Sequence, residues 1–252
     1  MANVDIFKHH KLISLAFSVG FVILVQYFAT PIPVFRFLVP AFVVYLFIVA
    51  VYNYFYLNQT NRYSPWIWLR SLLFISSWFI LFFLIPSAGL RGLFLLLGIL
   101  LIYVFQSMVG LMGEQMLFNE TLLTSFGFIM AMFALSWFFP VSSILYLGLV
   151  FVLMTTLTRS SFASTPASSD VQLMGSLVIG ILVAESFWAL SFLPLHFSAL
   201  ALILFAIFYF LWVLFYYELF QHLTLRKVQF HLAVSSIIIV LILLLTPWSI
   251  IK

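Results

Sequence analysis

The chain has 252 residues, of which 66% are hydrophobic, 20% aromatic and only 6% charged. This composition excludes a water-soluble globule, because too few polar side chains are present to cover its surface, and predicts an all-α, polytopic membrane helix bundle without a soluble domain. The net charge of +4 comes from basic residues scattered along the chain, so no nucleic-acid partner is expected, and the lack of cysteine excludes disulfides and thiolate metal sites.

Nine stretches are long and apolar enough to cross a membrane. A hydrocarbon core of about 30 Å requires about 20 predominantly apolar residues in a helix. Helix is the element that fits, because it satisfies its own backbone polar groups inside lipid. In chain order the stretches are residues 12–30, 34–57, 66–86, 90–110, 121–139, 141–158, 172–193, 195–219 and 229–249.

The connections between these stretches alternate between two kinds. One kind is short and contains proline, which lacks a backbone N–H and therefore ends or begins a helix. The other kind is longer and polar. The short connections are Pro31 to Pro33, Pro86 to Gly89, Pro140 and Pro194, and the polar ones are residues 58–62, 113–120, 159–170 and 221–227.

Basic residues near the ends of the stretches predict the orientation of the chain. Those on the side of the N-terminus outnumber those on the other side, which favours a cytoplasmic N-terminus, cytoplasmic polar connections and an external C-terminus in the cell membrane. The two groups are Lys8, Lys11, Arg62, Arg70, Arg159, Arg226 and Lys227, against Arg36, Arg91 and Lys252.

The prolines of the turns are evenly spaced along the chain. Pro33, Pro86, Pro140, Pro194 and Pro247 follow one another at intervals of 53 or 54 residues. This period predicts a repeated helical hairpin within a single transmembrane domain of residues 1–252. Two helices of about 20 residues with short loops give the same spacing without any kinship between the hairpins, and both explanations remain open.

Glu185 is the acidic residue that lies well inside a predicted span. It precedes Pro194 by nine residues, which corresponds to about 13.5 Å along a helix and places it near the middle of the membrane. Because an ionised carboxylate is costly in lipid, Glu185 is expected to face the interior of the bundle. It would there serve as a proton or cation site, or make a structural hydrogen bond to Ser186 or a neighbouring helix.

Four further polar residues fall in pairs at matched depths. Arg70 and His231 each precede a turn proline by sixteen residues. We expect Arg70 to extend to the head groups and His231 to make a local hydrogen bond. Asn53 and Gln106 each follow a turn proline by twenty residues, which predicts hydrogen bonding between their helices.

Charged residues gather where the eighth span meets the cytoplasmic connection. Glu218 and His222 have the i, i+4 spacing of one helix face, and Arg226 and Lys227 follow. An interfacial charge network is the preferred interpretation. A metal site would need further ligands, such as Glu114 and Glu120 from another connection, and none is expected.

Three functional hypotheses follow, and no cofactor is implied. The first is a non-catalytic scaffold or accessory subunit, with the lipid bilayer and other membrane proteins or further copies of the chain as partners. The second is a small proton- or cation-linked transporter or channel that uses Glu185. The third is an intramembrane enzyme that uses the cytoplasmic-face residues Glu114, Glu120, Glu218 and His222.

Overall fold

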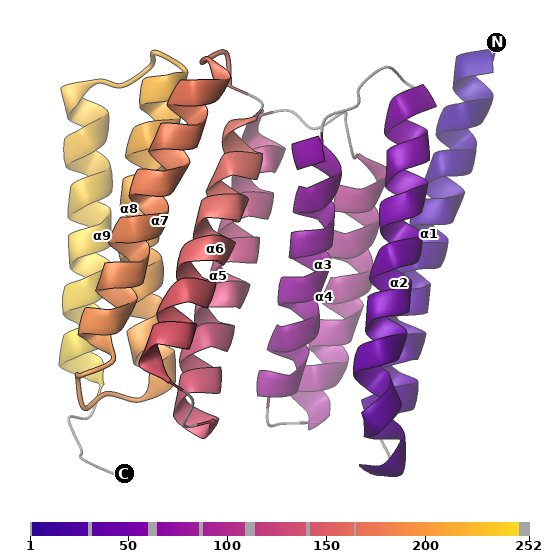
Figure 1. Ribbon diagram of the computed structural model, residues 1–252, viewed down its shortest axis with the longest axis horizontal. Coiled ribbons are helices and arrows are strands. Elements are labelled where there is room, and N and C mark those ends of the chain that lie inside the picture. Colours follow the sequence, from indigo (N-terminus) through magenta and orange to yellow (C-terminus); the bar gives the residue numbers. More distant parts are fainter. Residues whose placement is uncertain are drawn as a thin grey trace. The chain divides into compact units, whose positions relative to one another are not determined.

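The computed structural model describes residues 2–29, 32–59, 65–85, 88–108, 114–139, 142–163 and 165–246 (Figure 1). Next to the gaps, the side chains of residues 2–8, 27–29, 32–36, 59, 65, 67, 88, 114 and 115 fall outside this description. Pro31, Pro86, Pro140 and Pro247, which the sequence assigns to turns, also lie outside the described residues.

The described residues form nine helices, as predicted, and each predicted stretch corresponds to one of them. Eight are long and apolar enough to cross a membrane, and α3 has a shorter apolar stretch at Trp68–Leu84. The all-α membrane bundle is therefore confirmed. The helices are α1 (Ala2–Ala29), α2 (Ile32–Gln59), α3 (Pro65–Leu84), α4 (Ala88–Ser107), α5 (Glu114–Phe138), α6 (Ser143–Phe162), α7 (Ser169–Leu190), α8 (Phe197–Leu219) and α9 (Leu225–Leu245).

Several helices extend into residues that the sequence assigns to polar loops. α5 begins at Glu114 and α6 continues through Arg159 to Phe162. Polar side chains lower the local hydropathy and suggest a loop, but a helix in a bundle accepts them where they find partners on neighbouring helices. These loop assignments were wrong, and the correction moves Glu120 and Arg159 onto helices.

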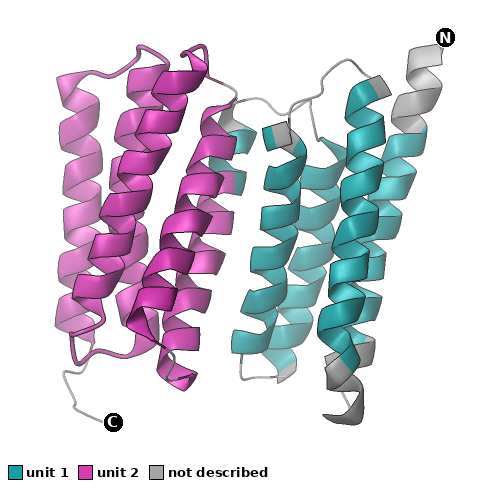
Figure 2. Cartoon of the chain, viewed as in Figure 1, with its two compact units in different colours: residues 1–120 teal, residues 121–252 magenta. Residues whose placement is uncertain are grey.

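The chain divides into two compact units, residues 1–120 and residues 121–252 (Figure 2). The first unit contains α1 to α4 and the first turns of α5, and the second contains the rest of α5 and α6 to α9. The hairpin repeat stays a prediction, because the division does not test kinship between hairpins.

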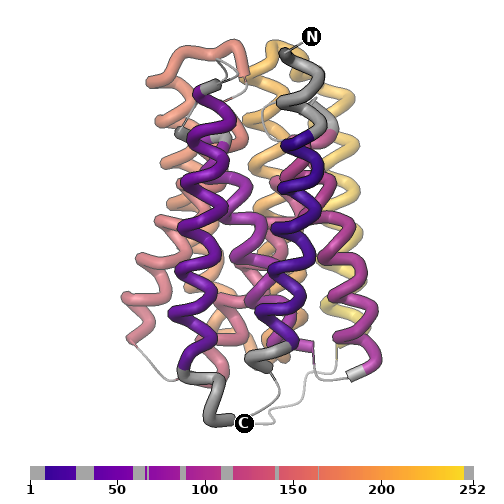
Figure 3. The backbone as a smooth tube through the Cα atoms, turned by 90° about the vertical axis from the view of Figure 1, so that its right-hand side faces the viewer, coloured from indigo at the N-terminus to yellow at the C-terminus, as the bar shows by residue number. Residues whose placement is uncertain are grey.

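In the first unit, α1 packs against α2 and α4, and α3 packs against the same two helices. Figure 3 shows α1 and α2 running side by side along their length. Aromatic contacts fill the interior, as where the rings of Phe42 and Phe79 stack with centroids 3.8 Å apart. Gly98 of α4 makes room for Trp78 of α3, since a Cβ atom at Gly98 would overlap the indole Nε1 atom.

In the second unit, α6 and α7 pack most closely, and α8 lies against α7 and α9. The close approach depends on Gly180, where a Cβ atom would overlap the Thr155 hydroxyl oxygen. The Tyr146 hydroxyl of α6 donates to the carbonyls of Leu135 and Phe139, which fixes α6 against the end of α5.

α2 contains two prolines, Pro33 and Pro40, at positions that a membrane helix tolerates. Pro33 lies in the first turn of α2, where the missing N–H has no carbonyl to bond. Pro40 lies inside the same helix. A proline at that depth is compatible with a membrane helix, whose neighbours can compensate for the lost bond.

Candidate functional site

Polar side chains from five helices meet in the first unit, toward the helix ends that carry the polar loops. We call this group the polar layer. Each helix of the unit contributes at least one member, and nearly all members are buried. The layer consists of His10 (α1), Tyr52 and Asn53 (α2), Arg70 and Ser71 (α3), Gln106 (α4) and Glu120 (α5).

Asn53 and Gln106 form the centre of the polar layer. The Gln106 Nε2 atom donates to the Asn53 Oδ1 atom, and the Asn53 Nδ2 atom lies 3.4 Å from the Gln106 Oε1 atom. The Ser71 hydroxyl also donates to that oxygen, at 2.5 Å. The predicted hydrogen bonding between these two helices is confirmed, and it joins α2, α3 and α4 at one depth.

Arg70 and Glu120 form an ion pair inside the first unit. The Arg70 Nε atom lies 2.7 Å from the Glu120 Oε2 atom, and their side chains are 4% and 0% exposed. Arg70 lies about 7.5 Å along α3 from the first residue of that helix. Glu120 lies about 9 Å along α5 from its first residue, so the two side chains begin at similar depths. The expectation that Arg70 extends to the head groups was wrong, because Glu120 neutralises it within the bundle.

The Arg70–Glu120 pair matters for stability because losing one partner leaves the other charge buried and unpaired. Each charge alone would be expensive in hydrocarbon, at roughly 2.5–3.5 kcal/mol for Arg or Asp on an insertion scale. Removing one partner from a buried pair leaves the other uncompensated and costs about 3–5 kcal/mol. Arg70 and Glu120 therefore depend on each other and hold α3 against the start of α5.

His10 completes the polar layer on α1. Its Nδ1 atom lies 2.8 Å from the Tyr52 hydroxyl oxygen, and its ring stacks on Tyr56 with centroids 3.6 Å apart. The side chain is 1% exposed. Sequence reasoning missed His10 because a histidine among Lys8, His9 and Lys11 is typical of a solvated terminus.

The second unit contains its own polar cluster, at the connection between α6 and α7. Arg159 donates from Nη1 to the Gln172 Oε1 atom and from Nη2 to the Ser169 hydroxyl at 2.8 Å. The Gln172 Nε2 atom in turn donates to the backbone carbonyls of Thr165 and Ala167, at 3.2 and 2.9 Å. These bonds connect the end of α6 and the start of α7 to the loop between them. We call the bonded group of Arg159, Ser169 and Gln172 the Arg159 clamp.

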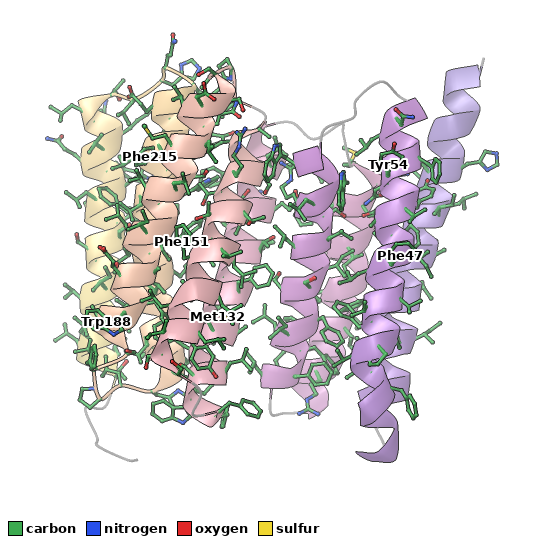
Figure 4. All side chains as sticks on the ribbon, viewed as in Figure 1. Phe47, Tyr54, Met132, Phe151, Trp188 and Phe215 are labelled. Carbon is green, nitrogen blue, oxygen red and sulfur yellow. The ribbon has the colours of Figure 1, made fainter. Side chains whose placement is uncertain are left out.

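Glu185 lies on the outer surface of α7, and the expectation that it faces the bundle interior was wrong. The residue is exposed, as are Ile181, Leu182 and Trp188, which share its face; Figure 4 labels Trp188. Ser186 does not bond to it but donates to the Leu182 carbonyl at 2.7 Å. Within the described chain, Glu185 has no hydrogen bond or ion pair.

The depth of Glu185 also needs correction. The sequence estimate counted helix as far as Pro194, but α7 ends at Leu190, and a turn follows. Glu185 therefore lies about 7.5 Å from the end of its helix, at about 1.5 Å per residue. The Cα–Cβ bond of a helical residue tilts toward the N-terminus, so the side chain starts toward the membrane centre and away from the nearer surface.

The cluster after the eighth span is not the helix face that its spacing suggests. α8 ends at Leu219, and Gln221 has a φ of 57°, so Glu218 and His222 do not share a helical register. The Lys227 Nζ atom donates to the His222 backbone carbonyl at 2.9 Å and lies 4.4 Å from the centroid of the Tyr217 ring. Glu218 makes no ion pair among the described residues.

The remaining predicted residues do not form a common site. His231 bonds between helices rather than locally, with its Nδ1 atom 2.7 Å from the hydroxyl oxygen of Tyr209 on α8. Arg226 is exposed in the first turn of α9. In the described part of the chain, no three His, Asp or Glu side chains are grouped in a way that could hold a metal ion.

Comparisons with protein-family models, with curated proteins and with solved structures find no significant match to this chain. A functional proposal therefore rests on the fold, on the two polar clusters and on the exposed Glu185. Chemically, the polar layer offers the buried imidazole of His10 and a buried carboxylate and guanidinium that neutralise each other, whereas Glu185 offers an acid without a described partner on an apolar surface.

Proposed function

We propose that the protein is a non-catalytic scaffold or accessory subunit that binds a further transmembrane segment along the exposed face of α7. The observation that carries this proposal is Glu185, an acidic residue without a partner on an otherwise apolar helix surface. Ionisable residues in transmembrane helices are almost always directed toward protein or a water-filled cavity. A surface that presents one to lipid is expected to be covered in the functional assembly.

The polar groups inside the two units support this proposal by contrast. Asn53 bonds to Gln106, Arg70 pairs with Glu120, and Arg159 bonds to Gln172. These groups satisfy one another and join the helices on which they lie. Glu185 lies more than one turn inside α7, unlike Asp170 and Glu218 at the ends of their helices, and its position on the surface favours an external partner.

The proposal includes an orientation in the cell membrane. Positive-inside bias supports a cytoplasmic N-terminus, cytoplasmic polar loops and an external C-terminus. Glu185 would then lie in the outer half of the membrane, and the Arg159 clamp would lie at the cytoplasmic surface.

A photo-crosslinking experiment tests whether the α7 face is covered. A photoreactive phenylalanine analogue at Ile181, one turn before Glu185, would be compared with the same analogue at Ile237 of α9. These residues are 47% and 59% exposed and lie at similar distances from the ends of their helices. We expect a protein adduct from position 181 and only lipid adducts from position 237. Lipid adducts alone from both positions would contradict the proposal.

The second candidate function is proton- or cation-linked transport, and the observation that favours it is the Arg70–Glu120 pair. A polar layer from five helices that includes a buried acid has the composition of a proton relay. Transport would then use Glu120 rather than Glu185, because Glu120 is buried among polar side chains whereas Glu185 is exposed on the apolar surface of α7. Proton uptake by reconstituted vesicles, present in the parent and absent in Glu120→Gln, would favour this function over a scaffold.

The enzyme hypothesis receives the least support. Glu120 is fully buried and engaged by Arg70, whereas Glu218 and His222 are exposed on another unit. The side chain of Glu114 lies outside the described residues. A catalytic acid or base must reach a substrate, and Glu120 is withheld from one by its ion pair.

A further inference from the structure

We propose that the segment bound to α7 belongs to a different protein and carries a lysine or arginine at the depth of Glu185, with which it forms an intramembrane ion pair. This inference rests on the proposed scaffold function and specifies the chemistry of its partner. It follows from the direction of the Glu185 side chain, from its neighbours and from the charges that a second copy of this chain could supply.

The direction of Glu185 prevents it from reaching water easily. Its Cα–Cβ bond tilts toward the N-terminus of α7, which is the more distant end of the helix, and the nearer end at Leu190 is more than one turn away. Long basic side chains near helix ends can extend to the head groups, but a glutamate starts inward and is too short to return. The carboxylate therefore needs a partner within the hydrocarbon.

The neighbours of Glu185 offer no such partner. Ile181, Leu182 and Trp188 on the same face are apolar apart from one indole N–H, and the Ser186 hydroxyl is directed to the Leu182 carbonyl. The adjacent residue Ala184 is buried. A helix that packs on this face must bring the complementary group with it.

A second copy of the chain does not provide a suitable charge from its described side chains. Contact between two α7 faces would bring two acids together among apolar residues, which is unfavourable when both are ionised. Of the basic residues toward the proline-marked turns, Arg91 is the one whose side chain is described. Its Nε atom already donates to the Ile85 carbonyl at 2.6 Å, and its guanidinium lies 5.9 Å from the centroid of the Phe82 ring.

Charge complementarity therefore favours a partner span with its own unpaired cation. A lysine or arginine at the depth of Glu185 is also costly in lipid when it has no partner, and pairing removes both isolated charges from the lipid. The remaining α7 surface is apolar and fits the packing of one further helix.

The test uses the full-length chain in native membranes, with the photoreactive analogue at Ile181. The protein crosslink is measured for the parent and for the variants Glu185→Gln, Glu185→Lys and Glu185→Asp. The control is Asp170→Asn, which removes the other acid of α7, exposed in the first turn of that helix. We expect at least a tenfold loss with Gln and Lys, partial retention with Asp and full retention in the control. Mass spectrometry of the adduct then identifies the partner protein and its basic residue. When that basic residue is replaced by glutamate in the partner, we expect the crosslink to Glu185→Lys to be restored.

The outcomes separate this inference from the proposed function. A full crosslink in Glu185→Gln, or failure of the charge exchange, would overturn the ion pair while leaving the scaffold intact. An adduct between two copies of this chain would overturn the separate partner. No protein adduct in the parent would overturn both proposals.

A chemical probe gives an independent result should a variant assemble poorly. Dicyclohexylcarbodiimide reacts with protonated carboxyl groups exposed to lipid. We expect Glu185 to be unreactive in native membranes and to become labelled after strong detergent separates the assembly. Rapid labelling of Glu185 in native membranes would show a protonated acid facing lipid and would contradict the ion pair.

Discussion

The Arg70 Nε atom lies 2.7 Å from the Glu120 Oε2 atom, and this contact joins α3 to the first turns of α5. Both side chains are withdrawn from solvent, and both lie between one and two turns from the ends of their helices. An ion pair in this position makes the packing of two helices depend on two residues far apart in the sequence.

Replacing either member of this pair should destabilise the protein by about 3–5 kcal/mol, because the other charge is left uncompensated. Arg70→Met and Glu120→Met should each lower the unfolding temperature in detergent. The double substitution should recover much of the loss, since both charges are then absent. Arg226→Met, at an exposed position, serves as control and should change little. A double variant as unstable as the sum of the single ones would contradict this account.

The amide pair of Asn53 and Gln106 should show a measurable coupling energy. A double-mutant cycle of Asn53→Ala and Gln106→Ala is expected to give about 0.6–1.7 kcal/mol, the range found for hydrogen bonds between membrane helices. Unfolding in a denaturing detergent provides the free energies. Ser18 bonds only to the Leu15 carbonyl of its own helix, so a cycle of Asn53 with Ser18 should give no coupling. Equal coupling in both cycles would rule out a specific contact.

Gly180 should be intolerant of any side chain. In Gly180→Ala the new Cβ atom would meet the Thr155 hydroxyl oxygen and lie 3.3 Å from the Phe151 carbonyl oxygen. We expect a loss of about 1–3 kcal/mol, as for other overpacked contacts, with partial recovery on adding Thr155→Ala. Gly148→Ala is the matched control, because nothing lies within 4 Å of the place that its new methyl group would take. Thermal unfolding of the three variants would distinguish them, and similar losses at both glycines would refute the packing argument.

Removal of the Arg159 clamp should loosen the connection between α6 and α7. In Arg159→Gln, Gln172 and Ser169 lose their charged donor, and the loop bonds of Gln172 are no longer oriented. Limited proteolysis of inside-out vesicles should then cut within residues 163–168 at least several times faster than in the parent. Arg226→Gln, which alters an exposed basic residue of α9, should leave the cleavage rate unchanged. Unaltered cleavage of Arg159→Gln would show that the clamp does not order the loop.

The nine helices could be predicted because each has enough apolar residues to cross lipid and the prolines separate them. The contact between Asn53 and Gln106 could also be predicted, since both follow a turn proline by the same number of residues and neighbouring hairpins place them at one depth. In both cases the information is local or depends on helix rise alone.

The Arg70–Glu120 pair could not be predicted, because hydropathy assigns a polar segment to a loop and cannot detect a partner on another helix. Glu114 to Glu120 therefore looked like a connection, although Glu120 is neutralised inside the unit. The direction of Glu185 was missed for a different reason. Large apolar residues lie on every side of α7, so hydropathy does not distinguish the face that packs from the face that is exposed. The small residues Gly175, Gly180 and Ala184 all lie on the packed face and were the signal that could have found it.

Native mass spectrometry of the protein released directly from membrane patches tests the central claim, that α7 binds another protein through Glu185. We predict a complex of the 29.0 kDa chain with a different polypeptide. In the variant Glu185→Gln, we predict that this complex is lost. Detection of the 29.0 kDa chain alone, or of complexes containing only copies of it, would contradict the account.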